Sequence, residues 1–408
     1  MAAVHERSSV MLDAPAEWKV RRLGTFATKV GSGATPRGGK EVYLTSRVSH
    51  ALIRSQHVFD RRFDGDEIAF ISEEHSQELR NAEVHQGDIL LNITGDGVTF
   101  ARACIVPDDI LPACVNQHVS IVRVDPSTCV PGYLLAFLTH PVTKRYIESF
   151  NTGGSRRAIT KGHIESFEVP LPPLSVQRWI AGILSAYDEL IENSQGRIRI
   201  LEEMARALFH EWFVEFRFPG HTNGKLIQSS LREVPEGWQK KKLGEVLELS
   251  YGKALKQEER LDGNVPVFGS SGIVGHHNEA LVKGPGIIVG RKGNVGSVFW
   301  SDNDFYPIDT VYFVTSRLPL RFLYYDLQTK NFLNNDAAVP GLNRSQAYSL
   351  ETKVPPQNML HRFVTIADAF EQQASLLRRQ IANLQQTRDL LLPRLFSGQV
   401  NTQVEGRP

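Results

Sequence analysis

The chain has 408 residues with 46 basic and 45 acidic side chains, so its formal net charge at pH 7 is +1. This balance excludes the strongly basic and strongly acidic classes of protein, and any basic surface for a polyanion has to come from local clustering. No apolar run is long enough to cross a bilayer, and the three cysteines lack the spacing of a zinc site, so we expect a cytoplasmic protein in a reducing environment, with no membrane contact.

The first expected element is a strand opened by a tryptophan, within residues 17–36 (EWKVRRLGTFATKVGSGATP). A counterpart lies at residues 237–256 (GWQKKKLGEVLELSYGKALK). Trp18 matches Trp238, and the Leu-Gly pairs that follow match at the same offset of 220 in residue number. The sequence therefore contains a duplication.

Between the first tryptophan and residue 171, apolar runs alternate with turn signals. Residues 87–107 predict a strand, a tight turn and a strand, and residues 119–124 (VSIVRV) predict another strand. Residues 132–150 have helical periodicity with a break near Pro141. Residues 167–173 then predict a short strand that ends at a Pro-Pro pair.

The second half repeats this order. Residues 284–300 predict a strand, a glycine-rich turn and a strand, residues 309–314 a strand, and residues 319–333 a helix. Residues 351–356 predict the closing strand and its Pro-Pro pair. Both halves therefore mix α and β elements, without the regular βαβ alternation of a Rossmann fold.

A long helix is expected after each Pro-Pro pair, because apolar residues then recur in steps of four and three, the pattern of a helix packed along a partner. The second series repeats the first at a constant offset of 183 in residue number, and one charged side chain, Arg388, falls on it. About 35 helical residues make a rod of roughly 50 Å. We expect Pro393 to kink or end the second helix. The predicted seam contains Ile180, Leu184, Tyr187, Ile191, Ile198, Leu201 and Leu208, and Phe363, Phe370, Leu377, Ile381, Leu384 and Leu391.

We therefore predict an α+β (mixed α/β) chain with two pseudo-repeated globular domains, separated by a long antiparallel two-helix coiled coil and related by a pseudo-twofold axis. The second repeat is shorter by 37 residues, the difference between the offsets of 220 and 183. The expected boundaries are 1–171 for the first globular domain, 172–218 for the central helix, 219–354 for the second globular domain, and 355–408 for the C-terminal helix and tail.

This order of segments resembles the specificity subunit of type I restriction–modification systems. The features that carry the resemblance are GDILLNITG (87–95), VPVFGSSGIVGHHNE (265–279), GIIVGRKGNVGSV (286–298), PIDTVYFV (307–314) and both helix entries. The resemblance covers nearly the whole chain. It departs at the helix entries, where Val176-Gln177 and Met359-Leu360 replace the usual Glu-Gln pair.

The resemblance implies a non-catalytic reader of double-stranded DNA. Each globular domain is then a target recognition domain for one half of a bipartite sequence, and the helices set the spacing between the halves. The helices are also expected to dock two modification subunits, which methylate adenine, and a translocating restriction subunit completes the complex. The resemblance implies no cofactor or metal on this chain, with S-adenosylmethionine, ATP and Mg²⁺ on the partner subunits.

Candidate DNA-binding residues follow from their chemistry. Polar and basic side chains in glycine-rich turns bring hydrogen-bond donors close to phosphates or base edges. In the second half these residues are Arg291, Lys292, Asn294, Ser270, Ser271, His276, Asn343 and Arg344, with His277 in the same predicted loop; in the first they are Asn92, Thr94, Asp96, Ser155, Arg156, Arg157 and Lys161. Any one of them can equally be a solvated turn residue, but the turns taken together favour DNA.

Two other functions remain open. A structural adaptor with two protein-binding heads would have the same repeat, and a nuclease could use Asp336 and Glu351. The segment GATPRGGK (33–40) has glycine where a phosphate-binding loop needs its lysine, so that motif fails. Arg178, Trp179, Phe209 and Trp212 are candidates for docking modification subunits, with core packing as the alternative for the aromatic residues.

Overall fold

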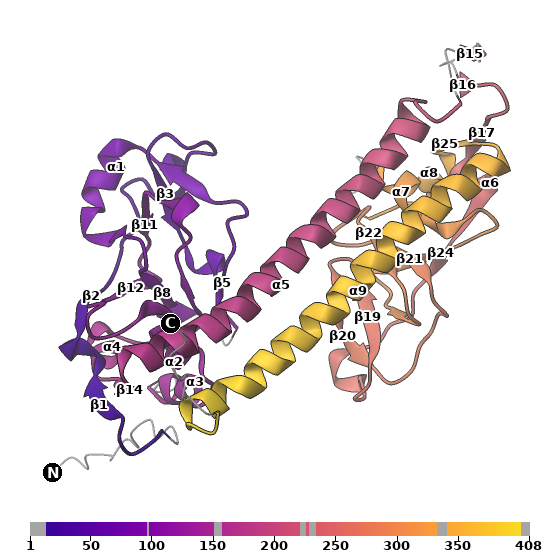
Figure 1. Ribbon diagram of the computed structural model, residues 1–408. Coiled ribbons are helices and arrows are strands. Elements are labelled where there is room, and N and C mark those ends of the chain that lie inside the picture. Colours follow the sequence, from indigo (N-terminus) through magenta and orange to yellow (C-terminus); the bar gives the residue numbers. More distant parts are fainter. Residues whose placement is uncertain are drawn as a thin grey trace. The chain divides into compact units, whose positions relative to one another are not determined.

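The computed structural model describes residues 14–95, 98–150, 157–220, 226–227, 234–332 and 341–400 (Figure 1). The chain forms two compact units. The first unit comprises the chain up to Ser194 together with the chain from Arg379 onward, and the second unit comprises Gln195–Arg378. Each long helix contributes one part to each unit.

The first unit contains two four-stranded sheets. The antiparallel sheet has the order β10-β8-β12-β2, and the mixed sheet has the order β6-β3-β11-β7 with β3 and β11 parallel. The strands are β2 (Ala27–Ser32), β3 (His50–Ile53), β6 (Ala69–Ile71), β7 (Glu83–Val84), β8 (Ile89–Asn92), β10 (Ala103–Ile105), β11 (Ala113–Val115) and β12 (Val119–Val124). The strands expected in residues 87–107 and 119–124 are confirmed.

Short elements complete this unit. A hairpin joins β4 (Val58–Phe59) to β5 (Arg62–Phe63), and β9 (Thr94–Gly95) pairs with β13 (Arg157–Ala158). The helices are α1 (Glu73–Glu78), α2 (Pro131–Thr139), α3 (Pro141–Ser149) and α4 (Lys161–Glu165). The helical break predicted at Pro141 separates α2 from α3, because proline is tolerated in the first turn of a helix and not in its interior.

The second unit repeats this topology. Its antiparallel sheet, β18-β24-β21-β22, matches β2-β12-β8-β10, and its second sheet, β20-β19-β23, keeps one parallel pair between β19 and β23. The strands are β16 (Val234–Pro235), paired with β15 (Leu226–Ile227), and β18 (Leu247–Tyr251), β19 (Val265–Gly269), β20 (Gly272–His277), β21 (Gly286–Gly290), β22 (Val298–Ser301), β23 (Tyr306–Pro307) and β24 (Val311–Ser316). The helices are α6 (Leu243–Val246), α7 (Leu320–Gln328) and α8 (Arg344–Ser349).

In each unit the entry strand pairs with the exit strand. In the first unit β1 (Lys19–Arg22) is antiparallel to β14 (Glu168–Leu171), with Lys19 opposite Leu171. In the second unit β17 (Gln239–Lys242) is antiparallel to β25 (Glu351–Val354), with Gln239 opposite Val354. The paired residues of the two ribbons correspond at the offsets found in the sequence, so the two ribbons have the same register.

The repeated Leu-Gly pair has a steric reason. The N–H of Leu23 donates to the Phe167 carbonyl, and the N–H of Leu243 to the Leu350 carbonyl, both at 2.8 Å. A Cβ on Gly24 would lie 2.9 Å from the Cβ of Glu165, and a Cβ on Gly244 would lie 2.9 Å from the Cβ of Tyr348. Glycine is therefore needed where each entry segment crosses α4 or α8.

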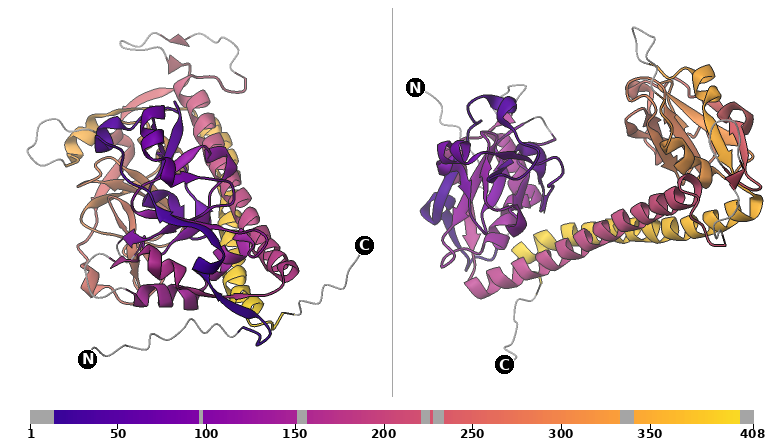
Figure 2. Two further views of the ribbon diagram at one scale, coloured as in Figure 1. Left: turned by 90° about the vertical axis from the view of Figure 1, so that its left-hand side faces the viewer. Right: turned by 90° about the horizontal axis from the view of Figure 1, so that it is seen from above.

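The two long helices are α5 (Leu174–Phe209), which continues as a π-helical turn over His210–Val214, and α9 (Gln357–Phe396). Each begins directly after its Pro-Pro pair, and α9 ends shortly beyond Pro393. Within each unit the helix segments lie side by side and antiparallel (Figures 1 and 2). The predicted seam positions are all buried or half-buried.

The aromatic end of α5 belongs to the core of the second unit. Phe209 and Trp212 are 3% and 5% exposed, and both contact Phe363 of α9, with ring centroids 5.8 and 6.4 Å apart. Of the two roles considered for these aromatic side chains, core packing is the one that holds for Phe209 and Trp212, because the end of α5 packs against both α7 and α9. Trp179 is half-buried against the core of the first unit, and Arg178 is exposed.

The helix entries differ for a reason that lies in α2 and α7. Gln177 is 1% exposed; its Oε1 accepts from the N–H of Val130 at 2.9 Å. Val130 is the N-cap of α2, whereas the N-cap of α7 is Pro319, which has no N–H. The second repeat therefore needs no acceptor there, and Leu360, the counterpart of Gln177, is 1% exposed and packs in the core.

Candidate nucleic-acid interface

In the second unit, three separate polar segments meet beyond the end of β21. Lys292 forms a β-bridge with Gly341, and the N–H of Leu342 donates to the Arg291 carbonyl at 2.8 Å. The hydroxyl of Ser297 donates to the Ser270 carbonyl at 2.8 Å, which joins the β19–β20 turn to the same place. The structure thus brings together the predicted turns at 270–271, 291–294 and 343–344.

Aromatic and basic side chains interleave at this edge of the second unit, where the three turns meet beyond the end of β21. Tyr251, at the end of β18, is 52% exposed. The guanidinium of Arg291 lies 5.3 Å from its ring centroid and that of Arg344 lies 5.2 Å away. Arg291 also donates from Nε to the Asp309 carbonyl at 3.0 Å. Burial, with a hydrogen bond between the hydroxyls of Tyr312 and Tyr251, raises the pKa of Tyr312 to about 12, so its hydroxyl stays protonated.

These contacts divide the candidates by role. Arg291 and Arg344 are both held over Tyr251 by their own unit, since Arg344 also donates from Nη1 to the Leu249 carbonyl at 3.4 Å. Lys292, Asn294 and Arg344 are exposed. Asn343 caps α8, because its Oδ1 accepts from the N–H groups of Ser345 at 2.9 Å and Gln346 at 3.4 Å.

The other predicted residues lie close to the β19–β20 hairpin. Ser271 is exposed in the turn and Ser270 is half-buried. His276 and His277 belong to strand β20, not to a loop, so that part of the prediction is wrong. His276 is exposed, while His277 is buried and accepts from the N–H of Leu261 at 3.0 Å. The glycines that suggested a loop permit the sharp turn and the register shift of this hairpin.

In the first unit, β9 and β13 bring the two predicted segments together. Gly95 pairs with Arg157 and Thr94 with Ala158, and the Thr94 hydroxyl is 2.6 Å from Nδ1 of His118. Arg157 forms an ion pair of 3.1 Å with Glu148. The side chain of Lys161, in the first turn of α4, is 63% exposed and lies 3.5 Å from Glu165. Asp96, Ser155 and Arg156 lie outside the described residues.

Asn92 is not on the surface. It is 0% exposed within β8, and its amide nitrogen donates to the carbonyls of Ser55 at 2.9 Å and Thr99 at 3.0 Å. The prediction of a DNA contact by Asn92 is therefore wrong: its amide joins β8 to two neighbouring loops. Such an internal partner cannot be read from a turn signal.

The two edges are equivalent in their backbone hydrogen bonds. The N–H of Ile159 donates to the Ile93 carbonyl at 2.9 Å, as that of Leu342 does to the Arg291 carbonyl. The N–H of Ile93 donates to the His118 carbonyl at 3.0 Å, as that of Arg291 does to the Thr310 carbonyl at 2.9 Å. Through these bonds Thr94 corresponds to Lys292, and the α4 cap Thr160 to the α8 cap Asn343. Each unit thus presents donors on the same edge of the same fold.

Sequence reasoning missed three side chains at these edges. Tyr251 was part of a matched segment, but its exposure beside two arginines depends on the pairing of β18 with β24. Gln117 and His118 precede β12, and Oε1 of Gln117 accepts from the Thr35 hydroxyl at 2.5 Å. The polar pair Gln117-His118, directly before the strongly apolar strand β12, was the sequence signal that could have indicated these two residues.

The chemistry of these edges suits a polyanion better than catalysis. Exposed ammonium and guanidinium groups bind phosphates, and amides, hydroxyls and imidazoles can pair with base edges. Within the described ranges, no group of three or more His, Cys, Asp or Glu side chains is arranged to hold a metal ion. Of the two residues considered for a nuclease, Glu351 lies opposite Lys242 in the entry ribbon, and Asp336 lies outside the described part of the chain.

Residues 15–203 and 235–386 both match the family model described as the type I restriction modification DNA specificity domain. The chain belongs to this family. The expected identification as a specificity subunit of type I restriction–modification systems, with DNA sequence recognition as its function, is confirmed.

The similarity of this specificity subunit to its relatives covers nearly its whole length. It is 23% identical to the type I restriction enzyme MjaIX specificity subunit of Methanocaldococcus jannaschii, covering 95% of each chain. It is 22% identical to the HindI specificity subunit of Haemophilus influenzae, covering 94% of this chain and 100% of that one. The crystal structure of a type I system S subunit from M. genitalium has the same fold, with a TM-score of 0.54 and 15% identity over 96% of this chain and 98% of that one.

The described helices of this specificity subunit include none that is both long enough and apolar enough to span a membrane.

Proposed function

We propose that this specificity subunit reads a bipartite DNA sequence, with one half recognised by each unit. The equivalence of the two edges carries the proposal: Thr94 and Lys161 in the first unit correspond to Lys292 and Arg344 in the second. Because the surrounding side chains differ between the units, the two half-sites differ in sequence. The long helices set the spacing between the half-sites.

We further propose that the subunit is non-catalytic, binds no cofactor and acts in the cytoplasm. Two adenine methyltransferase subunits that use S-adenosylmethionine dock on its helices, and restriction subunits that use ATP and Mg²⁺ join them. The exposed apolar side chains of the helices support docking, since five large ones face solvent. They are Leu190, Ile200, Met204, Leu376 and Leu390.

Mapping of methylated bases in the native host, with and without this gene, tests the function. Deletion is expected to remove methylation from one bipartite adenine motif. Replacing Lys292 and Asn294 by alanine should then change one half of the motif only. Lys283 is the matched control, because it is exposed and precedes the same strand, β21, that Lys292 follows. An unchanged methylation map, together with failure to co-purify with a methyltransferase subunit, would refute the proposal.

A further inference from the structure

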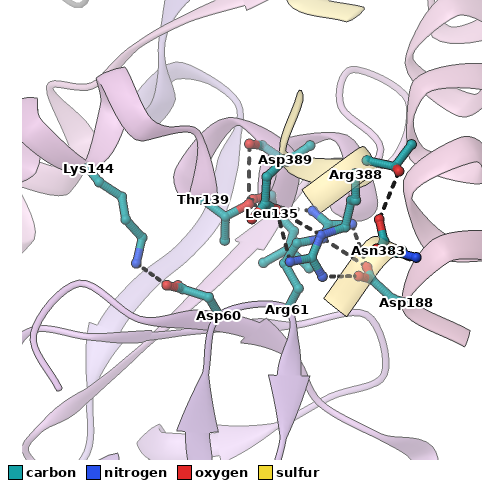
Figure 3. Close-up of polar contacts among 11 residues, drawn as sticks. Asp60, Arg61, Leu135, Thr139, Lys144, Asp188, Asn383, Arg388 and Asp389 are labelled. Atoms are coloured by element: carbon teal, nitrogen blue, oxygen red, sulfur yellow. Dashed lines mark hydrogen bonds and ion pairs between the residues drawn. The ribbon is translucent and has the colours of Figure 1, made fainter. Parts of the chain in front are cut away.

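A charged cluster joins the first unit's sheets to its helix segments. The side chain of Arg61, in the β4–β5 hairpin, donates from Nε to Oδ2 of Asp188 on α5 at 2.8 Å (Figure 3). The other carboxylate oxygen of Asp188 accepts from Nη1 of Arg388 on α9 at 2.7 Å. One carboxylate thus binds a guanidinium from the hairpin and a guanidinium from the neighbouring helix.

These side chains are shielded from water. The exposed fractions of the side chains are 6% for Arg61, 20% for Asp188 and 15% for Arg388. Burial makes such charge-assisted pairs stronger and less sensitive to salt than ion pairs on the surface. The hairpin itself is held on its far side, where Asp60 pairs with Lys144 of α3 (Figure 3).

The backbone of Arg61 is unusual for an arginine. Its φ is 60°, in the left-handed region that glycine and asparagine adopt at lower cost. The position therefore has a conformational preference against arginine, and the guanidinium contact with Asp188 compensates for it. A turn needed only to reverse the chain would be better served by glycine.

The second unit has an acidic residue at the equivalent helix position. Glu371 is the counterpart of Asp188 in the helix repeat, and its carboxylate accepts from Arg378 at 2.6 Å. Arg321 of α7 approaches Glu371 at 4.0 Å and donates from Nε to Asp368 at 3.0 Å. The guanidinium of Arg321 also covers the ring of Trp300 at 3.8 Å. Each unit thus ties its globular part to its helix segments through an arginine and an acidic helix residue.

We propose that Arg61 and Asp188 are positioning residues that fix the tilt of the first globular domain on its helix segments. This inference rests on the proposed function, because the tilt then determines where the first half-site must lie. The apolar core holds the domain near the start of α5, through Ile180 and Leu184. Asp188 lies one helical turn beyond Leu184, so its contact with Arg61 resists rotation about that attachment. Loss of the contact should leave the domain folded and let it rotate.

Arg61→Gly is the informative variant, because glycine removes the guanidinium and also suits the positive φ of this position. Arg62→Ala is the matched control, since Arg62 is the next residue of the hairpin and pairs with Asp64 within it at 3.1 Å. Spin labels on cysteines introduced at Glu74 of α1 and Glu192 of α5 report the tilt in the full chain. Both positions are exposed, while the three native cysteines are buried.

We expect Arg61→Gly to broaden the distribution of label distances with an unchanged unfolding midpoint. With the modification subunits added, its preference for the native spacer over spacers one base pair longer or shorter should fall by about tenfold, as for loss of one charge-assisted contact. Arg61→Lys should recover part of both properties. Arg62→Ala should match the unsubstituted protein in both measurements.

An unchanged distance distribution in Arg61→Gly overturns the proposed positioning role. A broader distribution with full spacer discrimination shows that the tilt does not set the half-site, and overturns the functional part. If the unsubstituted complex methylates no spacer variant, the proposed function fails, while the distance measurement still decides the role of the ion pair.

Discussion

Replacing Gln177 by leucine should destabilise the first unit, although leucine is the residue at the same position of the second repeat. The amide of Gln177 accepts from the N–H of Val130 at 2.9 Å and donates to the carbonyls of Pro172 at 2.9 Å and Thr128 at 3.2 Å. All three bonds are lost in Gln177→Leu, and the partly buried N–H of Val130 keeps no acceptor from this side chain.

The size of the effect follows from these bonds. An orphaned buried donor costs about 1–3 kcal/mol, and two further hydrogen bonds contribute about 1 kcal/mol each. The leucine recovers part of this by burying apolar surface, which leaves a net loss of about 2–3 kcal/mol. For a unit of this size the midpoint temperature should fall by about 5–10 °C.

The second repeat suggests the compensating change. Val130→Pro introduces the residue found at the N-cap of α7, and the φ of −80° at Val130 suits proline. In the Gln177→Leu background this substitution removes the orphaned N–H, so we expect it to recover about 1 kcal/mol. A thermodynamic cycle of the single and double variants, followed by circular dichroism and calorimetry, measures the coupling.

The control is the reverse change, Leu360→Gln. It buries an amide where Pro319 offers no N–H, so it should also cost about 1–3 kcal/mol. The reasoning is refuted if Gln177→Leu lies within about 0.5 kcal/mol of the unsubstituted protein, a usual range for a neutral surface change. It is refuted equally if Val130→Pro adds to the loss in the double variant.

Three further predictions concern packing, DNA binding and pH. Gly24→Ala and Gly244→Ala should each lower the free energy of unfolding by about 1–3 kcal/mol, because the added Cβ would lie 2.9 Å from a neighbouring Cβ. Gly182→Ala, in the interior of α5, should raise it by about 0.5–1 kcal/mol, because nothing lies within 4 Å of the added Cβ. Equal midpoints of these variants in thermal unfolding would contradict this. Lys292→Ala should weaken binding to all DNA duplexes by a similar factor and reduce the slope of log K against log salt concentration by about 0.9. Binding titrations at several salt concentrations measure this slope, with Lys283→Ala as the control. Burial, together with a neighbouring arginine, lowers the pKa of His57 and of His140 to about 4. Because an unfolded histidine titrates near 6.5, the unfolded chain takes up protons first, so the first unit should lose stability as the pH falls from about 6.5 to about 4. Protonation also disrupts the bonds that Nδ1 of each ring accepts, from the N–H of Arg54 at 3.0 Å and of Val142 at 3.1 Å. A constant midpoint temperature between pH 7 and pH 4.5 would argue against this assignment.

The duplicated elements could be predicted because local patterns encode them. The strand at Val119–Val124 and the break before Pro141 follow from apolar runs and from the constraint of proline on the backbone. Starts of the long helices follow from their Pro-Pro pairs for the same reason. The constant offset between the two apolar series linked the helices before any contact was known.

The partners of individual side chains could not be predicted, because they depend on residues far away in the chain. Asn92 stands at the end of an apolar run, as a turn residue would, yet its amide bonds to Ser55 across 37 positions. Arg388 lies in the apolar series of the second helix, and nothing in the sequence indicates that its partner is Asp188, which is 200 residues distant. Periodicity gives the face on which a residue lies, and the register between elements decides what it meets there.

The entry ribbons have a consequence for how new specificities can arise. β1 with β14, and β17 with β25, hold the two ends of each globular domain together in the same four-residue register, although the second repeat is the shorter one. A segment transferred by recombination from a related gene has to match these four backbone pairs, the crossing glycine and the residues that contact the helices, such as Arg61 and Val130 in the first unit. The rest of each globular domain can change in length and sequence while the helices stay the same, so under the proposed function the recognised half-site is exchanged as one inherited block.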